Sequence, residues 1–212
     1  MESETAPLVE KMTVKKTQSV HGRKVILGKL CGKKCAAVVC GVGKVNAAAG
    51  AQYAIDVLKA DKIINIGVAG GLNDSTEVGK IYGISAAVQY DFDLCQLNGT
   101  TIGTLNEYST AYLELLNVGL FEGRKLATAD RFNDDKADFK LLTQTLQADI
   151  RDMEGGAIAQ VCKHANVPFA SFKAISDVAG NGSTTEQFKE NLALCAKNMS
   201  GVIEKIFTAV NC

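Results

Sequence analysis

Two acidic residues could do chemistry because each follows an apolar run and precedes small residues. Glu154 lies in RDMEGGAIAQVC, and Asp177 lies in FKAISDVAG. An α/β sheet exposes polar groups in this way at the carboxyl ends of its strands, where ligands bind. One such carboxylate can hold a sugar while the other donates a proton. The pair is therefore the first candidate for a reactive site.

Each carboxylate also has a purely structural interpretation. Asp177, which follows Ser176, could cap a helix. Glu154 could be a first-turn residue that the helix dipole favours. Neither residue by itself shows whether its role is catalytic or structural. The surrounding segments must therefore be considered as well.

Two glycine motifs could bring the backbone close to a ligand. GVGKVN (41–46) follows a strand pattern and opens a helix pattern, but Asn46 stands where a dinucleotide fingerprint needs its third glycine, and the motif completes no P-loop. It fits a tight strand-to-helix turn equally well. GVAGGL (67–72) is more specific, because glycines at a strand end leave backbone amides open to sugar oxygens.

Strand and helix patterns alternate along the chain, which favours an α/β fold. We predict a single three-layer domain over 1–212, with a mostly parallel mixed sheet flanked by helices. The strands are expected at 24–30, 35–43, 62–72, 81–93, 125–132 and 167–180, with a turn at 32–34 and a short strand before Met153. The helices are expected at 45–60, 107–118, 135–147, 154–164 and 185–207.

Composition excludes several classes of function. The 212 residues are 47% hydrophobic, which suits one compact core. The 23 basic residues balance the 23 acidic ones without a basic run, so we expect no nucleic acid partner. No apolar stretch is long enough to span a bilayer and the amino terminus is acidic, so we expect a cytoplasmic protein without membrane association.

The seven cysteines are an odd number and most lie in apolar runs, so reduced and buried thiols are expected. Cys31 and Cys35 invite a metal interpretation. However, the chain has only two histidines and no second close cysteine pair, so a four-ligand site is hard to assemble. We therefore expect no metal site.

Five segments occur in the order that a known family shows. They are GVGKVNAAAGA, INIGVAGGL, ATADRF, DMEGGAIAQVC and PFASFKAISDVAG. Together they resemble the nucleoside phosphorylase superfamily, most closely its 5'-methylthioadenosine/S-adenosylhomocysteine nucleosidases. The resemblance covers nearly the whole chain and implies a nucleoside phosphorylase-like fold. It also implies hydrolysis of the N-glycosidic bond of a 5'-substituted adenosine, which releases adenine without a metal or redox cofactor.

The resemblance also implies residue roles. Asp177 would be the general acid that protonates N7 of adenine, with Ser176 beside it. Glu154 would bind the ribose hydroxyls, and Met153 would pack under the sugar. Phe132 would stack on adenine, although a lone aromatic residue usually belongs to a core.

The amino-terminal MESETAPL resembles the family segment whose carboxylate activates water, which places that role on Glu4, with Glu2 a weaker candidate. Val68, Ala69 and Gly70 would complete the substrate-binding residues. Adenine is a poor leaving group, so Asp177 must hold a proton near neutral pH, and a water-poor pocket favours this.

Three departures from the family pattern bear on activity. Family members begin with an apolar strand before the glutamate, so the first strand appears to be missing here; either the chain is truncated or a shortened sheet leaves Glu4 on a mobile terminus. Val68 stands where relatives often carry Ser or Thr, and it offers no side-chain donor. Lys173 stands where relatives usually carry Arg, so a point charge replaces a bidentate fork.

The segment at 90–103 resembles a family loop that lends apolar groups to a neighbouring subunit, which implies a homodimer with Leu97 near the partner's site. A phosphate-dependent phosphorylase remains an alternative, but the arginines do not stand in the contexts expected for phosphate binding: Arg23, Arg124, Arg131 and Arg151. A catalytically weak nucleoside-binding protein is a second alternative, suggested by the missing strand and by Val68.

Overall fold

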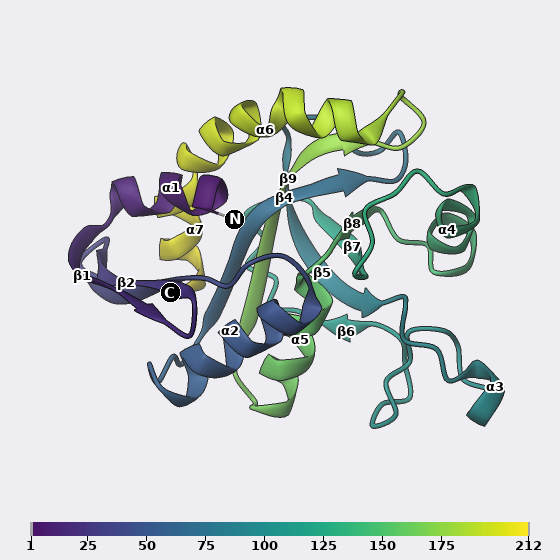
Figure 1. Ribbon diagram of the computed structural model, residues 1–212, viewed down its shortest axis with the longest axis horizontal. Helices are drawn as coiled ribbons and strands as arrows, with labels where there is room; N and C mark the ends of the chain where they lie inside the picture. The colour runs from purple at the N-terminus through teal and green to yellow at the C-terminus, as the bar shows by residue number, and fades with distance from the viewer. Residues whose placement is uncertain (1, 212) are drawn as a thin grey trace.

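The computed structural model describes residues 2–211, which form two β-sheets surrounded by helices (Figure 1). The small sheet contains β1 (Thr13–Val20), β2 (Arg23–Leu30) and β3 (Lys33–Val39). The large sheet contains β4 (Ile63–Gly71), β5 (Ile81–Gln89), β6 (Leu113–Glu114), β7 (Gly123–Thr128), β8 (Ile150–Asp152) and β9 (Phe169–Val178). No helix among residues 2–211 has the length and apolar character needed to cross a membrane.

The helices are α1 (Glu2–Lys11), α2 (Lys44–Asp56), α3 (Cys95–Asn98), α4 (Lys136–Lys140), α5 (Gly155–His164), α6 (Thr184–Ser200) and α7 (Ile203–Val210), with a π-helical segment η1 (Leu141–Thr145) after α4. The helices α2 and α5 pack together on one side of the large sheet, and α6 packs against β9 on the other (Figure 1). The two sides have separate apolar clusters, one centred on residues of α5 and the other on residues of α6 and α7.

The small sheet is antiparallel and built from two tight hairpins. Both residues of each turn have positive φ, 48° and 78° at His21-Gly22 and 49° and 78° at Cys31-Gly32. Turns of this kind match the twist of paired strands. The expected strand at 24–30 is therefore present as β2 and the one at 35–43 is present in part as β3, which ends at Val39, with the turn slightly earlier than predicted. The sequence did not predict β1, because TVKKTQSV is polar and mostly exposed and is held as a strand by its pairing with β2.

The large sheet is mixed. The pairs β4–β9, β5–β7 and β7–β8 are parallel, whereas β4–β8, β5–β6 and β5–β9 are antiparallel. Because β9 pairs with β4 on one edge and with β5 on the other, the strands β5-β7-β8-β4-β9 close into a barrel-like ring. The predicted α/β architecture with flanking helices is confirmed. The prediction of a mostly parallel three-layer sheet is wrong in part, because residues 81–83 of β5 run antiparallel to β9 and close the sheet.

Three helix predictions need correction. The segment at 107–118 is not helical but contains β6, because its backbone bonds to the sheet: Leu115 N donates to Ser85 O and Leu116 N to Phe169 O. The segment at 135–147 is divided into α4 and η1. The long helix at 185–207 is divided into α6 and α7 around Gly201. The short strand expected before Met153 is present as β8.

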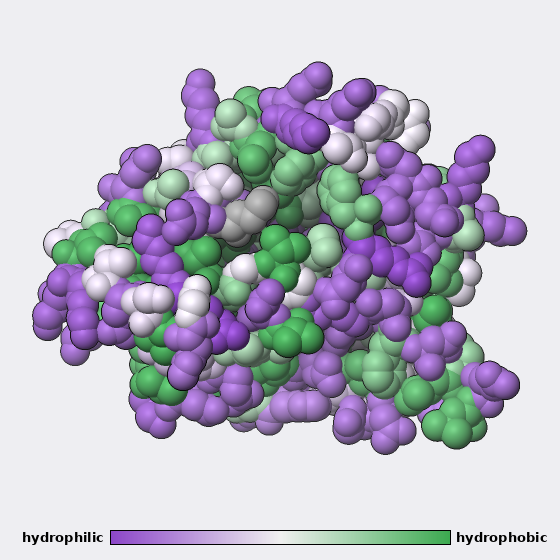
Figure 2. Space-filling view, in the orientation of Figure 1, coloured by the Kyte–Doolittle hydropathy of each residue, from purple (hydrophilic) through white to green (hydrophobic). Residues whose placement is uncertain are grey.

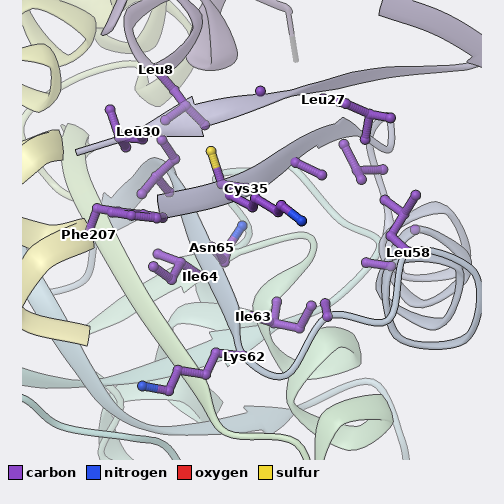
Figure 3. Close-up of a pocket in the computed structure, with 18 of the residues that line it drawn as sticks. Leu8, Leu27, Leu30, Cys35, Leu58, Lys62, Ile63, Ile64, Asn65 and Phe207 are labelled. Atoms are coloured by element: carbon purple, nitrogen blue, oxygen red, sulfur yellow. The ribbon is translucent and has the colours of Figure 1, made fainter. Parts of the chain in front are cut away.

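An apolar cavity of about 1200 Å³ lies between β4, the small sheet, α2 and α7. Figure 3 shows Leu30 and Phe207 near Ile64 of β4 in this cavity. On that side of β4, β8 pairs only with Gly70 and Gly71, and within residues 2–211 no strand pairs with the edge from Ile63 to Ala69. The cavity lining includes neither Glu154 nor Asp177, so this space is separate from the candidate carboxylates.

The cysteines within the described residues form no disulfide. Cys162 and Cys195 are buried, but Cys31 and Cys95 are exposed, so the prediction of buried thiols is wrong for these two. Cys31 is exposed because it occupies a hairpin turn. No cluster of possible metal ligands occurs in the part of the chain that the structure describes.

Candidate active site

The carboxyl end of β9 presents Asp177. Every residue of this strand is buried, and Asp177 is only 1% exposed. Ser176 Oγ donates to Asp177 Oδ1 at 2.7 Å, while Oδ2 is buried without a hydrogen-bond partner among residues 2–211. Burial raises the pKa of Asp177, and the Ser176 hydrogen bond and the charge of Arg151 oppose this. The protonated form is therefore favoured relative to an exposed aspartate.

The helix-cap interpretation of Asp177 is not supported. The helix that follows β9 starts at Thr184, and its cap is Ser183, whose side chain accepts from Glu186 N. Asp177 thus lies at a strand end without a capping hydrogen bond in the described residues. A buried carboxyl with one unengaged oxygen is a typical candidate for contact with a ligand.

Glu154 lies at the junction of β8 and α5. It occupies the N-cap position of α5, but its side chain makes no capping hydrogen bond to that helix. Instead, Glu154 Oε1 accepts from Gly43 N at 3.0 Å. Burial raises the pKa of Glu154, Asp152 and Glu4 add to this, and Lys173 and the Gly43 amide oppose it. The side chain therefore bridges α5 and the turn before α2.

The GVGKVN motif builds this turn. Gly43 has a φ of 97°, a conformation that favours glycine, and it precedes α2 directly. The next amide, Lys44 N, donates to Asp130 Oδ1 at 2.7 Å. Both amides at the start of α2 are thus used by carboxylates of the chain, so the motif positions Glu154 and Asp130.

Helix α1 brings Glu4 to β4. Glu4 Oε1 accepts from Val68 N at 2.9 Å. A Cβ on Gly67 would lie 2.7 Å from that same oxygen and 3.5 Å from Lys173 Nζ, so glycine at 67 leaves room for both side chains. Glu4 therefore lies on a helix, and its carboxylate is bonded to the backbone of β4. Glu2 points elsewhere: its exposed carboxylate pairs with Lys24 at 3.3 Å.

A buried ion pair lies beneath these carboxylates. Lys173 Nζ is 2.9 Å from Asp152 Oδ2, and the two side chains are 2% and 1% exposed. Asp152 also accepts from Thr128 Oγ1 at 2.6 Å and from Gly155 N at 2.9 Å. Burial alone would lower the pKa of Lys173, but Asp152, Glu154 and Glu4 together raise it. Lys173 is thus the shared cation of three carboxylates.

Sequence reasoning did not identify Asp152 and Thr128. The position of Asp152 could have indicated a role in the site, because Asp152 comes two residues before Glu154 at the end of a short strand. Only the fold shows that its partner is Lys173, which lies on a different strand.

The remaining predicted residues lie at the same strand ends or on the rim. Val68, Ala69 and Gly70 form the end of β4, where Ala69 O accepts from Ser176 Oγ at 3.3 Å. Met153 is half-buried between β8 and Glu154. Phe132 is 49% exposed and meets Phe188 edge to face, with ring centroids 5.7 Å apart, so it is not a core residue.

The ends of β4, β8 and β9 therefore hold two kinds of carboxyl group. Burial raises the pKa of both Asp177 and Glu154, but only Glu154 lies in the field of the Lys173 ammonium, which opposes that rise. Environments that differ in this way are typical of sites where one carboxyl acts as an acid and another as a base.

Comparisons with known proteins concern the fold of the chain as a whole. The model of the phosphorylase superfamily matches residues 1–208. The structure is similar to a 5'-methylthioadenosine/S-adenosylhomocysteine nucleosidase from Colwellia psychrerythraea in complex with adenine, with a TM-score of 0.90, 29% identity, and coverage of 99% of this chain and 92% of that chain. It is also similar to the corresponding nucleosidase from Neisseria meningitidis in complex with methylthio-immucillin-A, with a TM-score of 0.88, 27% identity and coverage of 98% and 95%.

A futalosine hydrolase from Helicobacter pylori has the same fold, with a TM-score of 0.90, 21% identity and coverage of 98% of this chain and 94% of that chain. The resemblance to the nucleosidases that the five sequence segments indicated is confirmed.

Proposed function

The chain belongs to the phosphorylase superfamily, and we propose that it hydrolyses the N-glycosidic bond of 5'-methylthioadenosine, S-adenosylhomocysteine or a related 5'-substituted adenosine. Water adds to C1' of the ribose while the bond from C1' to N9 breaks. The electron pair of the broken bond passes to the base. Adenine leaves with a proton at N7. The residues 1–212 act as one catalytic domain that needs no metal or redox cofactor.

The observation that carries this proposal is the state of Asp177. Its Oδ1 is held by Ser176, its Oδ2 is buried without a hydrogen-bond partner among the described residues, and burial raises its pKa. Such a carboxyl can keep its proton near neutral pH and donate it to N7 of adenine from Oδ2. Ser176 fixes the rotamer of the acid.

Glu154 is the group that we assign to the ribose hydroxyls. As bond breaking proceeds, the sugar gains positive charge, and a nearby carboxylate stabilises that charge. Gly43 N holds one oxygen of Glu154, and this amide and Lys173 both oppose the rise in the pKa of Glu154 that burial causes. Met153, next in the chain, packs under the sugar in this proposal, and Phe132 on the rim stacks on adenine.

Glu4 is the group that we assign to the attacking water. A general base must be ionised and held in place, and Glu4 Oε1 is fixed by Val68 N. The backbone amide of Val68 thus compensates for its apolar side chain by orienting the carboxylate. Ala69 and Gly70 continue the same strand end and form the floor of the substrate site.

A phosphate-dependent phosphorylase is the competing reaction. Two of the four arginines named above already have partners in the chain, because Arg124 donates to Ser75 O and Arg131 pairs with Asp138, while Arg23 lies on the small sheet. Water is therefore the better nucleophile. A weak nucleoside-binding protein is the other alternative, and the ordered position of Glu4 argues against it.

Adenine release from 5'-methylthioadenosine, with and without phosphate, tests the proposal. We expect release without phosphate and a loss of about a hundredfold or more in Asp177→Asn. Release that depends on phosphate would establish the phosphorylase instead. Binding of the nucleoside without turnover by a folded chain would establish the binding protein.

A further inference from the structure

A bulge in β9 determines where Asp177 lies. In β4, Ala69 is opposite Ile175 of β9. In a regular ladder Gly70 would then be opposite Ser176, but it is opposite Asp177 instead. Ser176 is therefore an extra residue, and it shifts Asp177 by one position along the sheet. A bulge of this kind disrupts the ladder, so the backbone groups around it need other partners.

On the edge of β9 that faces β5, backbone pairing stops just before this bulge. The pairing with β5 ends at Ala174, and Ile175 still bonds to Gly79 and Lys80. From 176 to 178, no strand in the described part of the chain pairs with that edge. These three residues are buried, and buried backbone N–H and C=O groups need hydrogen-bond partners.

Two amide side chains of α6, which packs against β9 (Figure 1), supply such partners. Gln187 Oε1 accepts from Val178 N at 3.1 Å, and Gln187 Nε2 donates to Val178 O at 3.2 Å. Asn191 Nδ2 donates to Ser176 O at 3.1 Å. The two residues are four positions apart and so share one face of the helix. Helix α6 thus bonds to the residues directly before and after Asp177.

The neutral charge of these two side chains suits a buried acid. A lysine or arginine could also donate to Ser176 O, but its charge beside Asp177 would favour the ionised carboxylate. An amide is also both a donor and an acceptor, as the two bonds to Val178 require. Gln187 and Asn191 therefore satisfy the backbone around the bulge without adding a charge beside the carboxyl group.

We propose that Gln187 and Asn191 are positioning residues for Asp177. They hold the bulge at Ser176, and the bulge keeps Asp177 opposite Gly70 with its carboxyl group buried. The inference rests on the proposed function, because it concerns the acid of that reaction. Neither amide takes part in the proton transfer, so its loss should act only through the position and the solvation of the acid.

The charged groups that act on Asp177 stay in place when either amide is replaced. Burial is the main cause of the raised pKa of Asp177, the Ser176 hydrogen bond and Arg151 on β8 oppose it, and Asp134 adds to it. On α6, burial raises the pKa of Cys195 to about 11, so this thiol stays neutral near pH 7. A shift in the titration of Asp177 would therefore report its solvation. The charged side chains of α6 are all exposed: Glu186, Lys189, Glu190 and Lys197.

Kinetics over a range of pH test the proposal. The variants Gln187→Met and Asn191→Leu nearly keep the size of each side chain and remove its hydrogen bonds. For adenine release from 5'-methylthioadenosine, we expect kcat to fall roughly ten- to hundredfold and KM to change less than about threefold. The alkaline limb of kcat, where the acid loses its proton, should move to lower pH, because a looser bulge admits water to Asp177.

Cys195→Ala is the matched control. Cys195 lies four residues after Asn191, and its Sγ donates to Ile175 O at 3.1 Å, but Ile175 O keeps its bond from Gly79 N at 2.8 Å. This variant should lower the midpoint of thermal unfolding without moving the alkaline limb of kcat. If Gln187 and Asn191 only stabilise the fold, their variants will behave in the same way, and that result would overturn the proposal.

Titration of the Asp177 carboxyl group by carbon-13 NMR requires no turnover, so it separates this inference from the proposed function. The signal is identified by its absence in Asp177→Asn. A lower pKa of Asp177 in Gln187→Met and Asn191→Leu, but not in Cys195→Ala, supports the inference even if the wild type hydrolyses no nucleoside, a result that would overturn the proposed function alone. An unchanged pKa in both amide variants overturns the inference. A cooperative thermal melt shows that each variant is folded, and the alanine variant at the same position replaces one that is not.

Discussion

Asp177, the residue that we propose as the acid, should lower the free energy of unfolding at neutral pH. Burial raises its pKa above the value of about 3.9 for an unfolded aspartate. Its contribution to stability is complete below the unfolded pKa, and it is lost as the pH rises through the folded pKa, because the fold then has to accommodate a buried charge. The residue that we propose as the acid should therefore weaken the fold at neutral pH.

Asp177→Asn removes this titration while keeping the size of the side chain. We expect the free energy of unfolding of the variant, relative to wild type, to increase between about pH 4 and about pH 8. Urea unfolding across that range measures the difference. Glu107→Gln, which changes an exposed carboxyl, is the control and should give a difference that does not vary with pH. A flat difference for Asp177→Asn would contradict the raised pKa.

Lys173 should be needed for stability as well as activity. Lys173→Met leaves Asp152 buried without its cation, which should cost about 3–5 kcal/mol of the free energy of unfolding. Lys173→Arg keeps the charge and should recover most of that loss. The double variant with Asp152→Asn should be more stable than Lys173→Met alone, as a direct pair interaction requires. Lys189→Met, an exposed lysine on α6, is the control and should change little.

At the scale of elements, the site depends on two short segments that carry carboxylates to the end of β4. Helix α1 delivers Glu4 to Val68, and the junction of β8 with α5 delivers Glu154 to Gly43. Glycines make these approaches possible. A Cβ at Gly155 would lie 2.4 Å from Leu126 Cδ2 and 3.0 Å from Asp152 Oδ2, so a larger residue there would require these side chains to move. The glycines that let the helices pack closely against the strands therefore also place the carboxylates.

Helix α1 offers an internal comparison between two glutamates. Glu4→Gln should lower kcat for adenine release by about a hundredfold or more, because the amide cannot take a proton from water. Glu2→Gln should leave kcat nearly unchanged, since Glu2 makes an exposed pair with Lys24 and its side chain is 73% exposed. Steady-state kinetics on both variants checks this. Equal losses in the two would mean that α1 matters only as a structural element.

At the scale of the molecule, the barrel-like ring is covered by helices, but one segment extends away from it. Helix α3 lies at the end of this extension (Figure 1), and Figure 2 shows apolar side chains gathered in the same region. Leu97 of α3 is 79% exposed. An exposed leucine in such a projection suits contact with another protein surface. We propose that this surface contacts the partner subunit of a homodimer.

Leu97→Asp tests that assignment. We expect the wild type to sediment as a dimer and the variant to dissociate at concentrations where the wild type does not. If Leu97 also lines the partner's 5'-substituent pocket, KM for 5'-methylthioadenosine should rise in the variant. Gln96→Asp places the same charge at a neighbouring exposed position and is the control. A wild type that sediments as a monomer would exclude the homodimer.

The sequence by itself determined which acidic residues lie at strand ends, and it determined most of the strands. Asp177 and Glu154 were identifiable because an apolar run followed by an acidic residue and small residues is a local pattern. The strands 24–30, 62–72 and 167–180 were identifiable for the same reason. The polar strand β1 and the irregular segment at 107–118 were not, because pairing with other strands, and not local pattern, defines their conformation.

Only the tertiary structure decided which residues meet. The pairing of β5 with β9 closes the sheet, Lys173 meets Asp152, and Gly70 separates Arg151 from Asp177. Each of these contacts depends on the register between strands that are distant in the sequence, and register is fixed by the burial of whole strand faces in the folded core. A local pattern can show that a carboxyl lies at a strand end, but the charge beside it depends on the neighbouring strand.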